Sequence, residues 1–333
     1  MVGLGVLALV ALFAVAAPTS SANAQNKAQD KAQDSYPSKP VRIVVGFAPG
    51  GSVDLMARFY GKRFGDTWGQ SFVVENRPGA AGNIAAQLVA QAKPDGYTLL
   101  LTSIVHSINA SLYSSLPFDP AKNFAAIAPV ALAPNGIAVA SSVPIYSLAE
   151  LVSYAKANPG KLEYASSGAG TLMHMGMELF KESAAIKVLH VPFNGTGPAV
   201  NAVIGGHVPV LSSGYGSALP FAETGKLRML AISTAQPSPL APGMPTVAEA
   251  AGLPGYEAVG WMGLLAPAGT PKEIVDKLNA EILRVQQSPD VPDWLARQGL
   301  QPYHLTADAF SALVKSDMEK WGKVVRESGI KAE

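Results

Sequence analysis

The sequence predicts an α/β protein with two lobes, in which two mainly parallel β-sheets flanked by helices are joined by a double-crossover hinge. From residue 41 onward, short β-branched and apolar runs alternate with amphipathic helical patterns, which is typical of βαβ units. Two long extended runs, at residues 124–141 and 256–267, separate an N-terminal series of these units from a central series. Two connections between two series indicate lobes that face a cleft and close about a hinge.

The N-terminal series alternates strands and helices in short succession. Residues 41–45 are mostly β-branched, and residues 52–68 carry apolar side chains at steps of three and four, which predicts a strand followed by a helix. The remaining expected elements of this series are a strand at 72–74, a helix at 82–92, a turn at 93–96 and a strand at 97–102.

The central series continues this alternation, whereas the C-terminal part is helical. The expected central elements are helices at 148–157, 171–183 and 198–204 and strands at 162–165, 187–191, 208–211 and 228–232. Three helices with no strand between them follow, at 271–287, 292–298 and 307–327. We therefore expect a discontinuous first lobe of residues 37–130 and 254–333, and a second lobe of residues 131–253.

The first 24 residues predict export through a cleaved signal peptide. Residues 2–17 are apolar over a length too short to span a bilayer comfortably, and Ala22-Asn23-Ala24 offers the small-x-small pattern of a cleavage site. No Lys or Arg precedes the apolar run, so a membrane anchor is the alternative; a start codon further upstream would supply the missing basic residues. Residues 25–36, which include a KAQD repeat, predict a flexible leader.

Composition excludes several kinds of function. Lys and Arg number 25 against 24 Asp and Glu, so no net field favours nucleic acid or an anionic membrane. The absence of cysteine excludes disulfides, thiolate metal sites and a cysteine nucleophile. Any affinity for a charged ligand must therefore come from local geometry.

Three loops share one pattern, in which a strand runs into a loop rich in Gly, Ser, Thr or Asn and then into a helix. They lie at residues 46–52, 166–171 and 192–198. The amino end of a helix presents unpaired backbone N–H groups and a partial positive charge to an anion. A single loop of this kind is usually only a helix cap. Three of them, divided between two lobes that face one cleft, favour a binding site for an anion.

The first loop differs from a nucleotide-binding P-loop. Its spacing, Gly46-x-x-x-x-Gly51-Ser52, is one residue short, and Ser52 stands where the P-loop has Lys. Polyphosphates normally recruit Lys, Arg or Mg²⁺, and the three loops contain no Lys or Arg. This favours a small carboxylate as the ligand.

Motifs for catalysis, metals or cofactors are missing from the sequence. There is no Gly-x-Ser-x-Gly elbow, no His-Glu-x-x-His and no complete Gly-x-Gly-x-x-Gly, and the five histidines show no metal-ligand spacing. The alternative to a binding protein is a secreted hydrolase or lyase. It would use His174, one turn inside the expected helix, together with Ser166, Ser167 or Thr171.

Seven segments together carry a family resemblance. They are "YPSKPVRIVVGFAPGGSVDLMAR", "VVENRPGAAGN", "KPDGYTLLL", "YASSGAGT", "HVPFNGTGPA", "GKLRMLAIS" and "GLLAPAGTP". In content and order they resemble the periplasmic solute receptors of tripartite tricarboxylate transporters, also called the Bordetella uptake gene receptors. The resemblance covers the chain from Tyr36 to its C-terminus.

The resemblance implies a type II-like periplasmic-binding-protein fold and a receptor that is not an enzyme. It implies a monomer in the periplasm that closes on a ligand and serves a separate two-component membrane permease. The loop matching residues 47–54 would grip a ligand carboxylate, partly through ordered water, and residues 166–171 and 193–195 would contribute from the other lobe.

The candidate ligand-binding residues combine the three loops with nearby polar positions. They are Phe47, Gly50, Gly51, Ser52, Val53, Asp54, Ser103, His106, Ser166, Ser167, Gly168, Thr171, His174, Phe193, Asn194, Gly195 and Ser213. Asp54 also suits a structural role, since an acid in the first helical turn complements the dipole and can brace the loop. His106, Tyr215 and Trp261 are candidates for a flat wall of the site.

One position departs from the family pattern. Where many relatives read Val-Asp-Leu-Met-Phe-Asp, this chain has Val208-Pro209-Val210-Leu211-Ser212-Ser213. Ser213 then stands in place of an acid that faces the cleft in relatives. Because serine cannot pair with a ligand ammonium, we expect a dicarboxylate or an aromatic acid rather than an amino acid.

Overall fold

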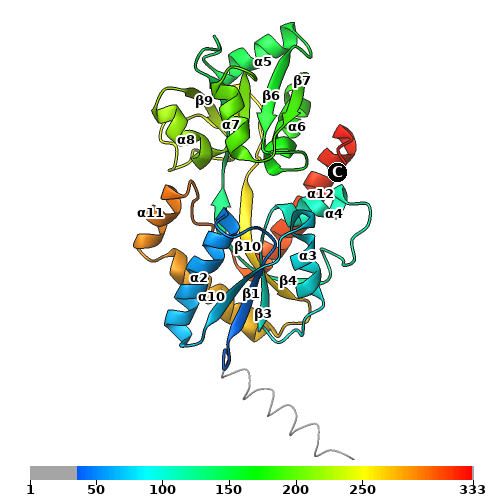
Figure 1. Ribbon diagram of the computed structural model, residues 1–333, viewed down its shortest axis with the longest axis vertical. Helices are drawn as coiled ribbons and strands as arrows, with labels where there is room; N and C mark the ends of the chain where they lie inside the picture. Colours follow the sequence, from blue (N-terminus) through cyan, green and yellow to red (C-terminus); the bar gives the residue numbers. More distant parts are fainter. Residues whose placement is uncertain (1–35, 332–333) are drawn as a thin grey trace, which may run out of the picture.

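The computed structural model describes residues 36–331, which form two lobes stacked along the long axis of the molecule (Figure 1). The expected signal peptide lies outside the described residues, as does the expected leader apart from Tyr36. Tyr36 is buried, and its hydroxyl donates to the carbonyl of Gly96 at 2.8 Å, so it is part of the packed body. No helix within residues 36–331 is long and apolar enough to cross a membrane.

The first lobe contains the N-terminal and C-terminal parts of the described chain. Its sheet has the order β2-β1-β3-β10-β4. The strands are β1 (Val41–Val45), β2 (Phe72–Asn76), β3 (Thr98–Ser103), β4 (Phe124–Ala133) and β10 (Gly260–Pro267). The helices are α2 (Ser52–Trp68), η1 (Ala80–Gly82), α3 (Asn83–Ala90), α4 (Val105–Leu112), α10 (Lys272–Gln286), α11 (Asp290–Arg297) and α12 (Ala307–Ser328).

The second lobe is built from the central part of the chain. Its sheet has the order β7-β6-β8-β5-β9. The strands are β5 (Asn135–Ala140), β6 (Leu162–Ser166), β7 (Val188–Pro192), β8 (Val210–Gly214) and β9 (Leu227–Ile232). The helices are α5 (Leu148–Ala157), α6 (Leu172–Ala184), α7 (Thr196–Ile204), α8 (Tyr215–Glu223) and α9 (Val247–Ala251).

In each sheet one strand runs against the other four. β10 is antiparallel to β3 and β4, and β5 is antiparallel to β8 and β9, while the remaining pairings are parallel. These two strands are the ones that carry the chain from one lobe into the other, and β5 follows β4 after Pro134 alone. The expected fold class is confirmed, and the reversed strand in each sheet is the strand of the crossover.

The first sheet is covered by helices whose apolar residues recur at helical spacing. Met56, Tyr60 and Phe64 of α2, at steps of four, are all buried. The buried Tyr60 hydroxyl donates to the carbonyl of Val130 at 2.8 Å, which satisfies its polar end. This packing fixes the position of α2, and hence of its amino end, relative to the sheet.

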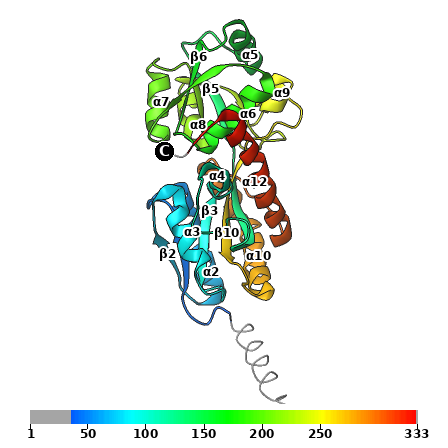
Figure 2. The ribbon, with the colours of Figure 1, turned by 90° about the vertical axis from the view of Figure 1, so that its right-hand side faces the viewer.

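Helix α12 connects the two lobes. It packs against α4 and β4 of the first lobe and against α6 of the second, and Figure 2 shows it running from one lobe to the other. Trp261 Nε1 on β10 donates to Asp317 Oδ2 on α12 at 2.8 Å, and both side chains are buried. Lys323 Nζ pairs with Glu182 Oε1 on α6 at 3.2 Å.

A second contact between the lobes is made by backbone alone. Gly216 in α8 lies against Gly299, which follows α11 and has φ of +70°. A Cβ on Gly216 would come within 2.5 Å of the Gly299 Cα, and a Cβ on Gly299 within 2.3 Å of the Gly216 Cα. The close approach of the lobes here requires glycine on both sides.

The buried Asp317 carboxyl makes stability depend on pH. Burial raises its pKa to about 6, although the hydrogen bond from Trp261 and the charge of Lys320 oppose this. The folded protein therefore binds this proton more tightly than the unfolded chain, and the contribution of this carboxyl to the free energy of unfolding falls as pH rises from about 4 to 6. We expect Asp317→Asn, which keeps an oxygen acceptor for Trp261, to remove this fall, worth about 1–3 kcal/mol.

Urea unfolding at pH 4 and pH 7 measures this difference. Glu319→Gln removes a charge from an exposed position on the same helix and should leave the pH dependence as in the wild type. Equal pH dependence in the wild type and Asp317→Asn would contradict the expectation.

Candidate ligand-binding site

Two adjoining cavities lie between the lobes and form one continuous cleft. The smaller has a volume of about 310 Å³ and the larger about 470 Å³. Phe47, Val105, Ser167 and Thr171 line both, so the cavities meet at these residues.

The smaller cavity is enclosed from both lobes. The first lobe contributes the loop before α2, the start of α2, the β3–α4 junction and β10; the second contributes the start of β5, the end of β8 and the start of α6. Its lining residues are Phe47, Gly51, Ser52, Val53, Ser103, Ile104, Val105, Ala133, Asn135, Ser167, Thr171, Leu172, Met173, Gly214, Gly260, Trp261 and Met262.

The larger cavity lies between α4 and the two glycine-rich loops of the second lobe. Its lining residues are Phe47, Ala81, Val105, Asn109, Leu112, Tyr113, Ser167, Gly168, Ala169, Gly170, Thr171, Phe193, Asn194, Gly195 and Lys331. Most of the polar groups here are hydroxyls, amides and backbone.

Helices α2 and α6 begin at the smaller cavity from opposite lobes. Gly51 precedes α2, and no side-chain acceptor caps the first turn of this helix. Thr171 precedes α6, and its Oγ1 accepts only the His174 N–H, at 3.4 Å. The N–H groups of the first turns have no partner in their own helix, so an anion between these two starts would meet donors and the positive ends of two dipoles.

Helix α7 begins at the larger cavity in the same way. Gly195 precedes it, and no side-chain acceptor caps its first turn. Gly195 has φ of +110°, which glycine adopts without strain, and nothing lies within 4 Å of where its Cβ would be. The open position leaves the start of α7 accessible from the cleft.

Asp54 braces the first loop from behind. Its carboxylate accepts from the Gly50 N–H, from Arg58 Nε and from Asn76 Nδ2, each at 2.9 Å, and the side chain is buried. Burial alone would raise the pKa of Asp54, but the hydrogen bonds from Arg58, Gly50 and Asn76 outweigh it and lower the pKa below its ordinary value. The charge of Arg58 is therefore neutralised by Asp54.

The second and third loops are tied to each other. The N–H groups of Phe193 and Gly195 donate to the carbonyls of Ser166 and Ser167, at 3.1 and 3.2 Å. Thr171 Oγ1 donates to the Gly168 carbonyl at 2.8 Å. The two loops therefore present one continuous backbone surface to the cleft.

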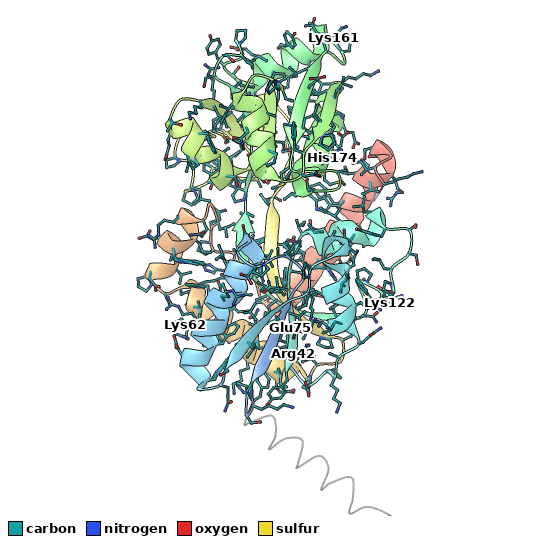
Figure 3. The ribbon with its side chains drawn as sticks, viewed as in Figure 1. Arg42, Lys62, Glu75, Lys122, Lys161 and His174 are labelled. Atoms are coloured by element: carbon teal, nitrogen blue, oxygen red, sulfur yellow. The ribbon has the colours of Figure 1, made fainter. Side chains whose placement is uncertain are left out.

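Ser166, His174 and His190 form a cluster behind these loops. The rings of His174 and His190 stack with centroids 3.8 Å apart, and Ser166 Oγ lies 2.7 Å from His190 Nε2. Ser166 is 0% exposed and His174 is 6% exposed, and neither lines the cleft. Figure 3 places His174 at the edge of the second lobe nearest the first. The partner of Ser166 is thus His190, not the expected His174.

The His174 ring instead holds the second loop. Its Nδ1 accepts from the Gly170 N–H at 3.1 Å, and its Nε2 lies 3.6 Å from Glu178 Oε1. Burial, followed by the neighbouring His174, lowers the pKa of His190 to about 4. These histidines support the loop rather than face the cleft.

Other expected residues also lie outside the cleft lining. His106 is packed between Phe118 and Phe124 with its Nε2 3.1 Å from the Pro120 carbonyl, and burial lowers its pKa to about 4. Ser213 is 1% exposed and donates to the Gly214 carbonyl at 3.3 Å. Because Ser213 is buried, the comparison with the acid of relatives gives no direct argument about the ligand.

The structure brings a large part of the expected set together. The expected residues that line the cleft are Phe47, Gly51, Ser52, Val53, Ser103, Ser167, Gly168, Thr171, Phe193, Asn194 and Gly195. Those that do not are Gly50, Asp54, His106, Ser166, His174 and Ser213. Of the three wall candidates, Trp261 lines the smaller cavity, whereas the buried His106 and Tyr215 line two other cavities.

Three polar lining residues were not expected from the sequence. Asn135 is the first residue of β5, directly after the crossing at Pro134. It is a polar residue inside an apolar extended run, and this pattern could have identified it as a cleft residue. Asn109 lies on α4, and its Oδ1 has no hydrogen-bond partner among the described residues. Lys331 lies beyond the last helix, where the sequence offers no signal for a cleft residue.

A metal site is not formed by the described residues. Within residues 36–331, no three His, Asp or Glu side chains come together so as to hold an ion.

Two α/β lobes joined by crossing strands, with helix starts converging on the cleft between them, define the class of two-lobed solute-binding proteins. The model of the tripartite tricarboxylate transporter family receptors matches residues 56–330. The chain belongs to this family, whose members are periplasmic solute-binding receptors.

Individual relatives extend this similarity over nearly the whole chain. The protein BugT of Bordetella pertussis is 33% identical over 331 residues, covering 98% of this chain and 98% of BugT. The structure of R. palustris Rpa4515 with adipate has a TM-score of 0.76 and 35% identity, covering 89% of this chain and 99% of that one. MatC from Rhodopseudomonas palustris with bound malate has a TM-score of 0.72 and 33% identity, covering 87% and 100%.

Removal of the Asp54 carboxylate should destabilise the first loop. Asp54→Ala removes the buried acceptor that the Gly50 N–H, Arg58 Nε and Asn76 Nδ2 share, so we expect the free energy of unfolding to fall by about 2 kcal/mol. Asp66→Ala, on the same helix, breaks only the exposed pair with Lys62 and should cost less than about 1 kcal/mol. Urea unfolding of both variants at neutral pH measures the difference, and equal losses would show that Asp54 is not a brace.

Proposed function

We propose that the protein is a periplasmic receptor that binds a small organic carboxylate in the interlobe cleft and delivers it to a separate two-component membrane permease. The observation that carries the proposal is the convergence of two helix starts, those of α2 and α6, on one cavity from opposite lobes. A carboxylate between them would accept hydrogen bonds from both lobes, and its binding would favour the closed arrangement. Bridging waters complete such a site at little enthalpic cost.

The ligand class that we propose is a small dicarboxylate. Adipate and malate, present in the two similar structures, both carry two carboxylates and differ in length. The cleft combines apolar side chains with neutral polar groups such as the Ser52 hydroxyl and the Asn194 amide, which suits carboxylates on a short carbon chain. An aromatic acid is the second candidate, because Phe47 and Trp261 border the smaller cavity.

An amino acid is disfavoured for a reason other than Ser213. Among the described residues, no Asp or Glu lines either cavity. A ligand ammonium would therefore enter the cleft without a carboxylate to pair with, which is costly once water is excluded.

The proposed location and assembly follow from the family and from the N-terminal sequence. Members of the family are periplasmic, and residues 1–24 have the pattern of a cleaved signal peptide. We propose export by this peptide and a monomeric receptor.

We further propose that binding occurs without turnover. The hydrolase or lyase alternative needs a nucleophile and a base that face the ligand, but Ser166 and His174 are buried outside the cleft lining. Ser167 Oγ, which does line the cleft, points to Met173 Sδ at 3.4 Å. No histidine lines either cavity among the described residues.

A ligand screen tests this proposal directly. In a thermal-shift assay with mono-, di- and tricarboxylates, aromatic acids and amino acids, we expect dicarboxylates to raise the melting temperature most. A ligand at 100 times its Kd adds about 2.7 kcal/mol to the free energy of unfolding. Chromatography after long incubation should recover the bound acid unchanged. Consumption of the acid, or stabilisation by no carboxylate at all, would contradict the proposal.

Substitutions at two neighbouring glycines should distinguish an effect on ligand binding from an effect on folding. Gly51 lines the smaller cavity with φ of −74°, and a Cβ there meets only the Ala48 carbonyl, at 3.5 Å. We expect Gly51→Val to fold normally and to weaken carboxylate binding at least tenfold, about 1.4 kcal/mol, because its side chain stands between the anion and the start of α2.

Gly50→Ala is the matched control. Gly50 is exposed, lies outside the cleft lining and has φ of +83°, so alanine there should cost about 1–2 kcal/mol of stability. Its effect on affinity should be smaller than that of Gly51→Val. Calorimetric titration and urea unfolding of both variants give the two measurements; unchanged affinity in Gly51→Val would show that the loop is only a turn.

A further inference from the structure

The cleft contains a single formally charged side chain among the described residues. Of all the residues that line the two cavities, only Lys331 is a Lys, Arg, Asp, Glu or His. It lines the larger cavity together with the start of α7 and the loop at Ser167. The smaller cavity, where α2 and α6 begin, has no charged side chain in its lining.

The end of α12 places Lys331 at this position. The helix ends at Ser328, and Gly329 has φ of +68°, a left-handed conformation that turns the chain out of the helix. Ile330 then packs against the apolar core, which fixes the direction of the next residue. Figures 1 and 2 show the C-terminal end of α12 beside the second lobe, at the level where the two lobes meet.

Lys331 is available to a ligand. Its side chain is exposed, and no ion pair or hydrogen bond among the described residues holds its ammonium group. Because α12 packs against both lobes, the position of Lys331 relative to the two glycine-rich loops depends on the same packing that sets the cleft.

We propose that Lys331 recognises the distal carboxylate of a dicarboxylate whose proximal carboxylate lies between the starts of α2 and α6. This inference rests on the proposed function and adds to it a residue that determines specificity. The two cavities meet at Phe47 and Ser167, so a short carbon chain passes between them, with one charged end in each. Lys331 then forms a charge-assisted hydrogen bond with the second end.

Neutral donors already present in the larger cavity explain why an uncharged far end does not need Lys331. The start of α7 and the amide of Asn194 can bind an uncharged polar group or water there. A monocarboxylate with an uncharged far end should therefore bind without the lysine. Lys331 contributes only when the far end carries charge.

The test compares two ligands and four proteins by calorimetric titration. The ligands are the tightest-binding member of the series from succinate to suberate, with malate included, and the monomethyl ester of that same acid. The proteins are the wild type, Lys331→Gln, Lys331→Arg and Lys161→Gln. Lys161 lies at the far tip of the second lobe in Figure 3, so its variant changes net charge equally without touching the cleft.

We expect Lys331→Gln to weaken dicarboxylate binding about fivefold and to change monoester binding less than about twofold. The difference between the two ligands should shrink as ionic strength rises from about 0.01 to 1 M, because an exposed ion pair is screened. Lys331→Arg should retain most of the discrimination, and Lys161→Gln should behave as the wild type. Thermal unfolding without ligand confirms that the variants fold alike.

Several outcomes overturn the inference. Equal losses of affinity for the dicarboxylate and its monoester in Lys331→Gln would mean that Lys331 does not recognise the distal charge. Wild-type protein that binds the monoester as tightly as the diacid, or binds only aromatic or other monocarboxylic acids, would also overturn it while leaving the carboxylate receptor intact. Failure to bind any carboxylate would overturn both this inference and the proposed function.

Discussion

The N–H groups in the first turn of α2 have no side-chain acceptor among residues 36–331, and the surrounding residues maintain this condition. Asp54 in that turn would ordinarily complement the helix amino end, as acids at this position do. Its oxygens are instead taken by Gly50, Arg58 and Asn76, and the guanidinium of Arg58 neutralises its charge. The acid therefore shapes the loop without competing with an incoming anion. The positive φ of Gly50 completes the turn that keeps the helix start facing the cleft.

Contacts outside the cleft determine the position of this helix start relative to the other lobe. Two crossing strands join the lobes covalently, α12 packs against both, and Gly216 meets Gly299 backbone to backbone. None of these contacts uses a side chain of the three loops. Contacts outside the cleft therefore set the spacing of the loops in this structure, and residues within the cleft determine what is bound between them.

The sequence predicted the fold class and the three loops because both depend on local patterns. Strand–loop–helix units are visible as alternation followed by glycine, and the loop residues Gly51, Ser167 and Asn194 do line the cleft. Two helices, α4 at the cleft and α8 in the second lobe, were missed for identifiable reasons. α4 follows β3 after a single residue, so no turn signal separates them, and α8 contains Pro220, which disfavours a helical prediction.

Side-chain direction was the main failure of sequence reasoning. His174 was correctly placed in the first turn of a helix, but whether it faced the cleft or the sheet depended on a stacking partner, His190, from another strand. Ser213 lies one residue from Gly214, which does line the cleft, and alternation along the strand turns the serine inward. Lys331 owes its position to the path of α12 across both lobes, which no local pattern encodes.

The charges in the cleft also fit a division of the ligand into two ends. A helix start carries roughly half an elementary positive charge, so two starts facing one cavity together offset about one carboxylate. A dicarboxylate brings a second negative charge that the smaller cavity cannot balance, since it has no cationic side chain in its lining. The start of α7 supplies about half of what the larger cavity would need. The full charge at Lys331 more than covers the remaining half, and because this charge is exposed and screened, it distinguishes ligands without holding them too tightly to be released.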